Sequence, residues 1–174
     1  MLSGSVPGDA STLIYLAKSG TFEEAERCVS RISVPPAVWQ EAVEAGERIG
    51  APDANRIRDA TRTGFVVRVE LDRYQQALAE AVADNHRLGR GESQVIALAS
   101  PVGAALLDEG RATRVAVSLG SKVTSTLLLP AVGVRSGSLE MAPAREMLRE
   151  LAIVTGATAA VVFEIEAALT RGRP

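Results

Sequence analysis

Residues 88–125 read LGRGESQVIALASPVGAALLDEGRATRVAVSLGSKVTS, and this segment predicts alternating helices and strands. A helix begins after the two glycines and carries Val95, Ile96 and Ala99 on one face, because these residues are spaced three, four and seven positions after a glutamate. The short apolar run GAALLD at residues 103–108 is typical of a buried strand. A second helix and a last short strand complete the segment.

The rest of the chain continues this alternation. Before the segment, we expect strands at residues 3–8, 32–34 and 65–69, and helices at residues 10–20, 21–30, 36–46, 53–64 and 72–85. After residue 125, the sequence predicts two or three further helices. Strands that alternate with helices favour a parallel sheet covered on both sides. We therefore expect three α/β/α layers around a central parallel sheet of four to five strands.

The composition indicates a single soluble globular domain over residues 1–174, with a helical extension from about residue 126. Hydrophobic residues make up 47% of the chain and charged residues 23%. Aromatic residues are only 3%, so the core must consist of Ala, Val, Leu and Ile. The net charge of −2 does not indicate that the protein binds nucleic acid. A local basic rim or bound metal ions could still allow nucleic-acid binding.

The single cysteine, Cys28, cannot form an internal disulfide, and one cysteine with one histidine cannot supply a zinc site of the usual ligand type. No apolar run reaches the roughly 20 residues of a membrane span, and the start MLSGSVPGD does not have the pattern of a signal peptide. We therefore expect a cytoplasmic protein that does not enter a membrane.

In an open parallel sheet, catalytic and binding residues lie at the carboxyl ends of strands and at the starts of the following helices. Four acidic residues of this chain occupy such positions. Asp9 follows the first strand, and Asp108 ends the strand at 103–108. Glu92 begins a helix on the same side as its apolar residues, and Glu41 lies in the helix after the Pro-Pro pair. Periodicity alone does not show that the four meet.

Each of these residues also has a plain structural interpretation. Asp9 could cap the helix that follows it, and Glu92 could be placed in the first turn of its helix because the helix dipole stabilises a negative charge there. Asp108 could belong to a turn, with Glu109 as the alternative acid at this place, and Glu41 could lie on a partly solvated face. An ionised carboxylate on an apolar face still needs a partner, which favours a site at Glu92.

Four stretches in this order, DASTLIYLAKSG, VPPAVWQEAV, LGRGESQVIALA and ALLDEGRATRVAVSLG, resemble the PIN-domain proteins. The likeness is to the VapC-like branch with a Leu-Gly-x-Gly-Glu stretch, and it runs from about residue 9 to residue 122. It implies a Rossmann-like fold and a ribonuclease that depends on Mg²⁺ or Mn²⁺, often the toxin of a toxin–antitoxin pair. On this resemblance, the family's acidic positions fall on Asp9, Glu41, Glu92 and Asp108, of which Asp9, Glu92 and Asp108 would hold the metal.

Two departures from the family pattern concern these positions. The polar stretch SVPG precedes Asp9 where relatives carry an apolar strand, and Asp108 is followed by a glutamate where many relatives have a second aspartate. Neither change removes a carboxylate.

A bound divalent ion would explain how four carboxylates can lie close together. Two carboxylates ~5 Å apart repel by about 3 kcal/mol at an effective dielectric near 20, so their clustering requires a cation. Mg²⁺ prefers oxygen ligands and keeps several waters, so two or three carboxylates and phosphate oxygens suffice. The ion can activate a water and neutralise charge on the leaving oxygen, which permits hydrolysis without histidine or cysteine.

The same region offers groups that could bind RNA. Arginines near the acidic positions could form a basic rim for the RNA backbone, and a serine after the first strand could contact a phosphate or a metal-bound water. Their plain interpretation is solvation for the arginines and helix capping for the serine. These residues are Ser11, Arg87, Arg90, Arg111 and Arg114.

Two other functions compete with the nuclease. A non-catalytic PIN-like module could bind RNA or protein with a vestigial site. An aspartyl-phosphate phosphatase would use Asp9 as its nucleophile, but such enzymes need a second acid two residues later, where this chain has Ser11.

The C-terminal segment suggests a partner. Five apolar residues lie along one side of the last predicted helix, and they would join a homodimer or a groove for a small antitoxin, or pack on the chain's own core. These residues are Val161, Val162, Ile165, Ala168 and Leu169.

Overall fold

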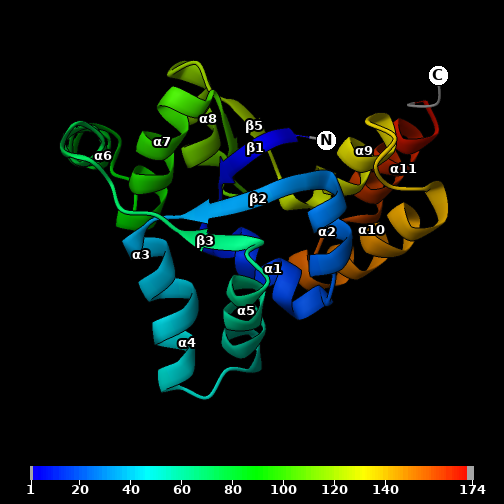
Figure 1. Ribbon diagram of the computed structural model, residues 1–174. Coiled ribbons are helices and arrows are strands. Elements are labelled where there is room, and N and C mark those ends of the chain that lie inside the picture. Colours follow the sequence, from blue (N-terminus) through cyan, green and yellow to red (C-terminus); the bar gives the residue numbers. More distant parts are fainter. Residues whose placement is uncertain (1, 172–174) are drawn as a thin grey trace.

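The computed structural model describes residues 2–171, which form five parallel strands and the helices around them (Figure 1). The strands are β1 (Leu2–Pro7), β2 (Val29–Val34), β3 (Val66–Arg68), β4 (Ala104–Leu106) and β5 (Lys122–Thr124). They pair as a three-stranded sheet in the order β1-β2-β3 and a two-stranded sheet of β4 and β5.

The two sheets meet at one point. Gly8, directly after β1, forms a parallel bridge with Leu106 of β4, and the Asp9 amide donates to the Leu106 carbonyl at 3.3 Å. The strand order across this junction is therefore β3-β2-β1-β4-β5. The expected central sheet of four to five parallel strands is thus present as two ladders, because β4 is only three residues long and touches β1 only at its end.

Helices cover both faces of these strands, as the alternation predicted. Helices α1, α5 and α10 lie together on one side, and α7 and α8 lie on the other, with α6 packed outside α7 (Figure 1). The helices are α1 (Ala10–Ser19), α2 (Phe22–Cys28), α3 (Pro36–Trp39), α4 (Ala45–Arg48), α5 (Pro52–Arg62), α6 (Arg73–His86), α7 (Arg90–Val102), α8 (Gly110–Ser118), α9 (Leu129–Arg135), α10 (Met141–Thr155) and α11 (Ala159–Arg171).

Two short segments depart from regular α-helix. The helix predicted at residues 36–46 runs from α3 to α4 through a π-helical turn, η1 (Gln40–Glu44). Such turns insert one residue into an α-helix and are frequent at functional sites. A 3₁₀ turn, η2 (Thr126–Leu128), follows β5. Both segments carry polar residues that matter for the site.

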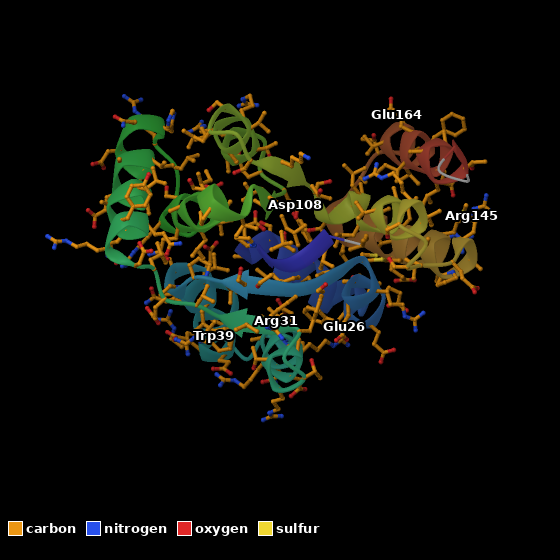
Figure 2. The ribbon with its side chains drawn as sticks, turned by 45° about the horizontal axis from the view of Figure 1, so that its top comes forward. Glu26, Arg31, Trp39, Asp108, Arg145 and Glu164 are labelled. Carbon is orange, nitrogen blue, oxygen red and sulfur yellow. The ribbon has the colours of Figure 1, made fainter. Side chains whose placement is uncertain are left out.

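Aliphatic residues dominate the core, as the low aromatic content predicted. The largest fully buried side chains are Phe65, Leu13, Leu16, Ile32, Ile57, Ile96, Leu106, Leu107, Leu129, Met147, Leu148 and Leu151. Trp39 is also buried, and the guanidinium groups of Arg58 and Arg68 lie 5.6 Å and 4.7 Å from its ring centroid. Figure 2 shows Trp39 on the same side of the molecule as Arg31 of β2. This tryptophan therefore has a structural role.

The helices after residue 126 pack on the α/β part, with α10 against α1 and α9 against α2. In α11, Ile165 and Leu169 are buried in the chain's own core, whereas Val161 is 41% exposed and Phe163 is 72% exposed. Most of the predicted apolar stripe therefore packs within the chain, including the half-buried Val162, whereas Val161 of the stripe and Phe163 beside it are exposed. Within residues 2–171, no helix has the length and apolar character needed to cross a membrane.

Candidate functional site

Asp9 lies where β1 ends and α1 begins. Its Oδ1 accepts a hydrogen bond from the Thr12 amide at 2.7 Å, which caps α1, and its Oδ2 accepts from the Asp108 amide at 3.3 Å. The preceding residue, Gly8, packs closely against Ile32 of β2. A Cβ at position 8 would lie only 2.8 Å from the Ile32 Cγ2 atom. Asp9 therefore caps the helix and also faces the carboxyl edge of the sheet.

The environment of Asp9 is unfavourable to its charge. Burial, with a smaller contribution from the nearby charge of Asp108, raises the pKa of this carboxyl to about 6, although the hydrogen bond from the Thr12 amide opposes the shift. Only 4% of the residue is exposed. A cation at this place would compensate the cost of ionising Asp9.

Asp108 is fixed directly behind Asp9 by two threonines. Its Oδ1 accepts from the Thr126 amide at 2.9 Å, and its Oδ2 accepts from the Thr126 hydroxyl at 2.5 Å and the Thr12 hydroxyl at 3.3 Å. Burial raises the pKa of Asp108, and the hydrogen bonds from Thr126 oppose this shift. Figure 2 shows Asp108 near the middle of the molecule. Its carboxylate is therefore held in one orientation.

Three other carboxyl groups lie with Asp9 around a small hollow. The hollow has a volume of about 170 Å³. It brings together the ends and starts of four separate segments, and a serine and an arginine complete its polar lining. The polar residues that line it are Asp9, Ser11, Glu41, Arg90, Glu92 and Glu109. Three of the four predicted acids thus line one hollow, and at the fourth place Glu109 lines it rather than Asp108.

The π-helical turn carries Glu41 to this hollow. Gly91, at the start of α7, lies so close that a Cβ there would be 3.2 Å from the Glu41 Oε2 atom and 3.4 Å from the Val38 Cγ2 atom. A Cβ at position 91 would require the Glu41 side chain to shift by a few tenths of an ångström. The second glycine of the Gly-x-Gly-Glu stretch therefore favours the close approach of α7 to Glu41.

Glu92 has a local partner as well as a place in the hollow. Its Oε2 accepts from the Gly89 amide at 2.8 Å, so that Glu92 forms a capping interaction at the start of α7. Val95, Ile96 and Ala99 on the same face are buried, as the spacing predicted. The helix start thus satisfies one carboxylate oxygen of the half-buried Glu92.

Glu109 caps the next helix in a similar way. Its Oε2 accepts from the amides of Arg111 at 2.5 Å and Ala112 at 2.9 Å. The Ala112 amide, with smaller contributions from the Arg111 amide and the charges of Arg111 and Arg114, lowers the pKa of this exposed carboxyl. Glu109 therefore remains ionised at the mouth of the hollow.

The predicted basic residues lie around the same place. Arg90 lines the hollow, and Arg111 donates to the Arg87 carbonyl at 3.4 Å, which links the end of α6 to the start of α8. Arg114 lies close enough to Glu109 to influence it. All four arginines are exposed, so their charges are accessible to a large anionic ligand.

The arrangement fits a hydrated divalent ion better than a closed protein cage. Among residues 2–171, no group of three or more histidine, cysteine, aspartate or glutamate side chains is close enough to hold a metal together. Mg²⁺ commonly uses one or two carboxylates and keeps several waters. The carboxylate oxygens around the hollow are donors of the type that Mg²⁺ and Mn²⁺ prefer.

Thr126 is the residue that the sequence analysis did not single out. It lies 18 positions from Asp108, so no local pattern connects the two. A signal was present in its position, because a polar residue directly after β5 falls at the same sheet edge as the acids.

We expect Thr126→Val to lower the free energy of unfolding by about 1.5–3 kcal/mol, because it removes a buried hydroxyl that donates to a carboxylate and keeps the side-chain shape. Chemical denaturation at pH 7.5 measures this difference. Thr170→Val is the control, since the Thr170 hydroxyl is exposed and donates only to the Glu166 carbonyl of its own helix. Equal stability of both variants would contradict the role of Thr126.

Comparison with known proteins yields one finding. Residues 7–158 match the PIN domain family, and this range contains every acidic residue of the candidate site. No curated protein and no solved structure matches the chain. The matched range covers most of the sequence and includes all five strand ends, the π-helical turn and Thr126. The chain therefore belongs to the PIN domain family, whose fold is Rossmann-like.

Proposed function

We propose that the protein is a metal-dependent endoribonuclease that hydrolyses phosphodiester bonds in RNA with Mg²⁺ or Mn²⁺. The observation that supports this most is the hollow that carboxyl residues from four separate segments line together. PIN domains are typically nucleases. Four carboxylates with few countercharges between them are costly unless a cation binds.

Each residue has a proposed part in this activity. Asp9, Glu92 and one further acid, Asp108 or Glu109, would hold the ion, at least one of them through a metal-bound water, because no three of the described carboxylates lie close enough to bind it directly. The lining of the hollow favours Glu109, with Asp108 then acting as a positioning residue that orients Asp9 through its amide. Glu41 would orient the attacking water by accepting its hydrogen bond. The bound ion would supply Lewis-acid stabilisation of the phosphodiester.

The arginines would bind the RNA backbone. Arg90 lines the hollow, and exposed charges lie nearby on Arg87, at the end of α6, and on Arg111 and Arg114 of α8. Ser11 would donate a hydrogen bond to a phosphate oxygen. Such contacts position the substrate and do not depend on its sequence.

The sequence from residue 88 to residue 92, Leu-Gly-Arg-Gly-Glu, is the feature that leads us to place the protein in the VapC-like branch. We therefore propose that it is the toxin of a toxin–antitoxin pair, acts in the cytoplasm and is inhibited by a small antitoxin protein. The exposed Phe163 and Val161 of α11 are available for a homodimer or for this antitoxin.

Metal binding is the first test, and we expect Mn²⁺ to stabilise the purified protein. Ligand at 100 times its dissociation constant adds about 2.7 kcal/mol to the free energy of unfolding. Thermal unfolding and calorimetric titration with Mn²⁺ measure the effect. RNA cleavage should appear with Mn²⁺ or Mg²⁺ and stop after chelation, and Ca²⁺ serves as a control for general ionic effects.

A non-catalytic PIN-like module is the second candidate, because the described residues place no three metal-binding groups in immediate contact. A vestigial site would give no heat and no stabilisation with Mn²⁺. Such a result, together with absent RNA cleavage, would contradict the nuclease function.

A further inference from the structure

A second hollow lies next to the acidic one, between α6 and α7. Its volume is about 480 Å³, which is within the usual range for small-ligand pockets. Ala79, Ala83 and Leu88 give it an apolar wall. Figure 1 shows α6 at the outer side of α7, away from strands β1 to β3.

Arg90 connects the two hollows, because its side chain lines both of them. A ligand that placed a phosphate group near Arg90 would therefore reach the acidic hollow at one end and the α6–α7 hollow at the other. A nucleotide has this shape, with a charged phosphate at one end and a flat, mostly apolar base at the other.

A buried hydroxyl in the wall has no partner. Ser93 of α7 is 1% exposed and lines the α6–α7 hollow, yet its Oγ forms no hydrogen bond with any described residue. Buried polar groups are nearly always paired, and a native exception calls for an explanation. The neighbouring Gln94 is fixed differently, since its Oε1 accepts from the Ala37 amide at 2.9 Å.

Two carboxylates on α6 determine which ligand fits. Glu80 and Asp84 are one helical turn apart and both line the hollow. Carboxylates accept hydrogen bonds and repel carbonyl oxygens. They therefore favour a base that presents an amino group. Guanine suits them best, because its ring N–H and amino group are parallel donors, whereas uracil presents carbonyl oxygens on both sides of its single N–H.

We propose, on the basis of the nuclease function proposed above, that the α6–α7 hollow binds one amino-bearing base of the RNA, guanine in preference to uracil. Single-stranded RNA is commonly recognised by such contacts to the edges of unstacked bases. The hollow would thus fix the nucleotide next to the phosphodiester that is cleaved, with Arg90 between them.

Titration of isotope-labelled protein with guanosine and uridine 5′-monophosphates, in the presence of a chelator, tests this without any cleavage. We expect the guanosine nucleotide to shift the amide signals of α6 and α7 and to bind about tenfold more tightly than the uridine nucleotide. Equal affinities, or shifts elsewhere only, would overturn the base site.

Matched variants locate the binding. Ala83→Phe fills the hollow and should abolish binding of the guanosine nucleotide, whereas Ala81→Phe on the exposed side of α6 should leave it unchanged. The double variant Glu80→Gln/Asp84→Asn changes only exposed groups, so the fold is kept, and the tenfold preference should fall to about one. An unchanged preference would contradict the role of the carboxylates.

The experiments distinguish failure of the proposed base site from failure of the proposed nuclease function. Binding of the guanosine nucleotide at α6 and α7 without any RNA cleavage would support the base site and overturn the nuclease. RNA cleavage that is the same in Ala83→Phe and in the unchanged protein would overturn the base site and leave the nuclease intact.

Discussion

Asp9→Asn should make the metal-free protein more stable at pH 7.5 and reduce RNA cleavage by at least about a hundredfold. The asparagine keeps the acceptor for the Thr12 amide and removes a buried charge that lies beside Asp108. It also loses the hydrogen bond from the Asp108 amide, which costs about 1 kcal/mol. We expect the net gain in the free energy of unfolding to be about 1–2 kcal/mol.

The pH dependence gives this expectation a sign that can be checked. The pKa of Asp9 is about 6 in the folded protein and 3.8 as its ordinary value, so the folded state binds the proton more tightly. Asp9 therefore contributes stability below pH 3.8 that is lost as the pH rises through 6, a difference of about 3 kcal/mol. At pH 4 the variant should be the less stable of the two proteins.

Chemical denaturation from pH 4 to pH 7.5 measures this crossing, and RNA cleavage with Mn²⁺ should fall by at least about a hundredfold. Asp59→Asn is the control, because Asp59 forms only an exposed pair with Arg62. A stability difference that is the same at both pH values would refute the burial of charge at Asp9.

Higher stability together with lost cleavage in Asp9→Asn would show that Asp9 serves the site at a cost to the stability of the fold. The burial that raises the pKa of Asp9 also prepares it for a cation, because the ion replaces the proton as the compensating charge. Mn²⁺ should therefore stabilise the unchanged protein and not Asp9→Asn. Functional sites commonly trade stability for activity in this way.

The regular part of the fold was predictable from spacing and composition. The apolar face of Val95, Ile96 and Ala99 gave the position of α7, and the buried run before Asp108 gave β4. These patterns are local, because helix and strand periodicity repeat within a few residues. The division of the sheet at Gly8 was not predictable, since it depends on how far short strands extend beside one another.

The site was predictable only in part for the same reason. The sequence supplied acids at strand ends, and Asp9, Glu41 and Glu92 do line one hollow. The choice between Asp108 and Glu109 depends on which of two neighbouring side chains turns inward toward Thr126. The π-helical turn that brings Glu41 into place has no spacing signal of its own.

Glu92→Gln should reduce RNA cleavage by about a hundredfold and leave the fold intact. The glutamine oxygen still accepts from the Gly89 amide, so α7 keeps its start, whereas the hollow loses one charge. Calorimetric titration should show Mn²⁺ affinity lowered by about 10–100-fold. Glu164→Gln is the control, because Glu164 is exposed on α11, away from Asp108 in Figure 2.

A second substitution at the same position separates the charge of Glu92 from its capping role. Glu92→Ala removes both, so it should lose cleavage as Glu92→Gln does and also lose about 1 kcal/mol of stability. If Glu92→Gln kept full cleavage while Glu92→Ala lost it, Glu92 would act only through the start of α7. Because the capping bond uses only one carboxylate oxygen of a residue that also lines the hollow, we expect the two variants to differ in stability and not in cleavage.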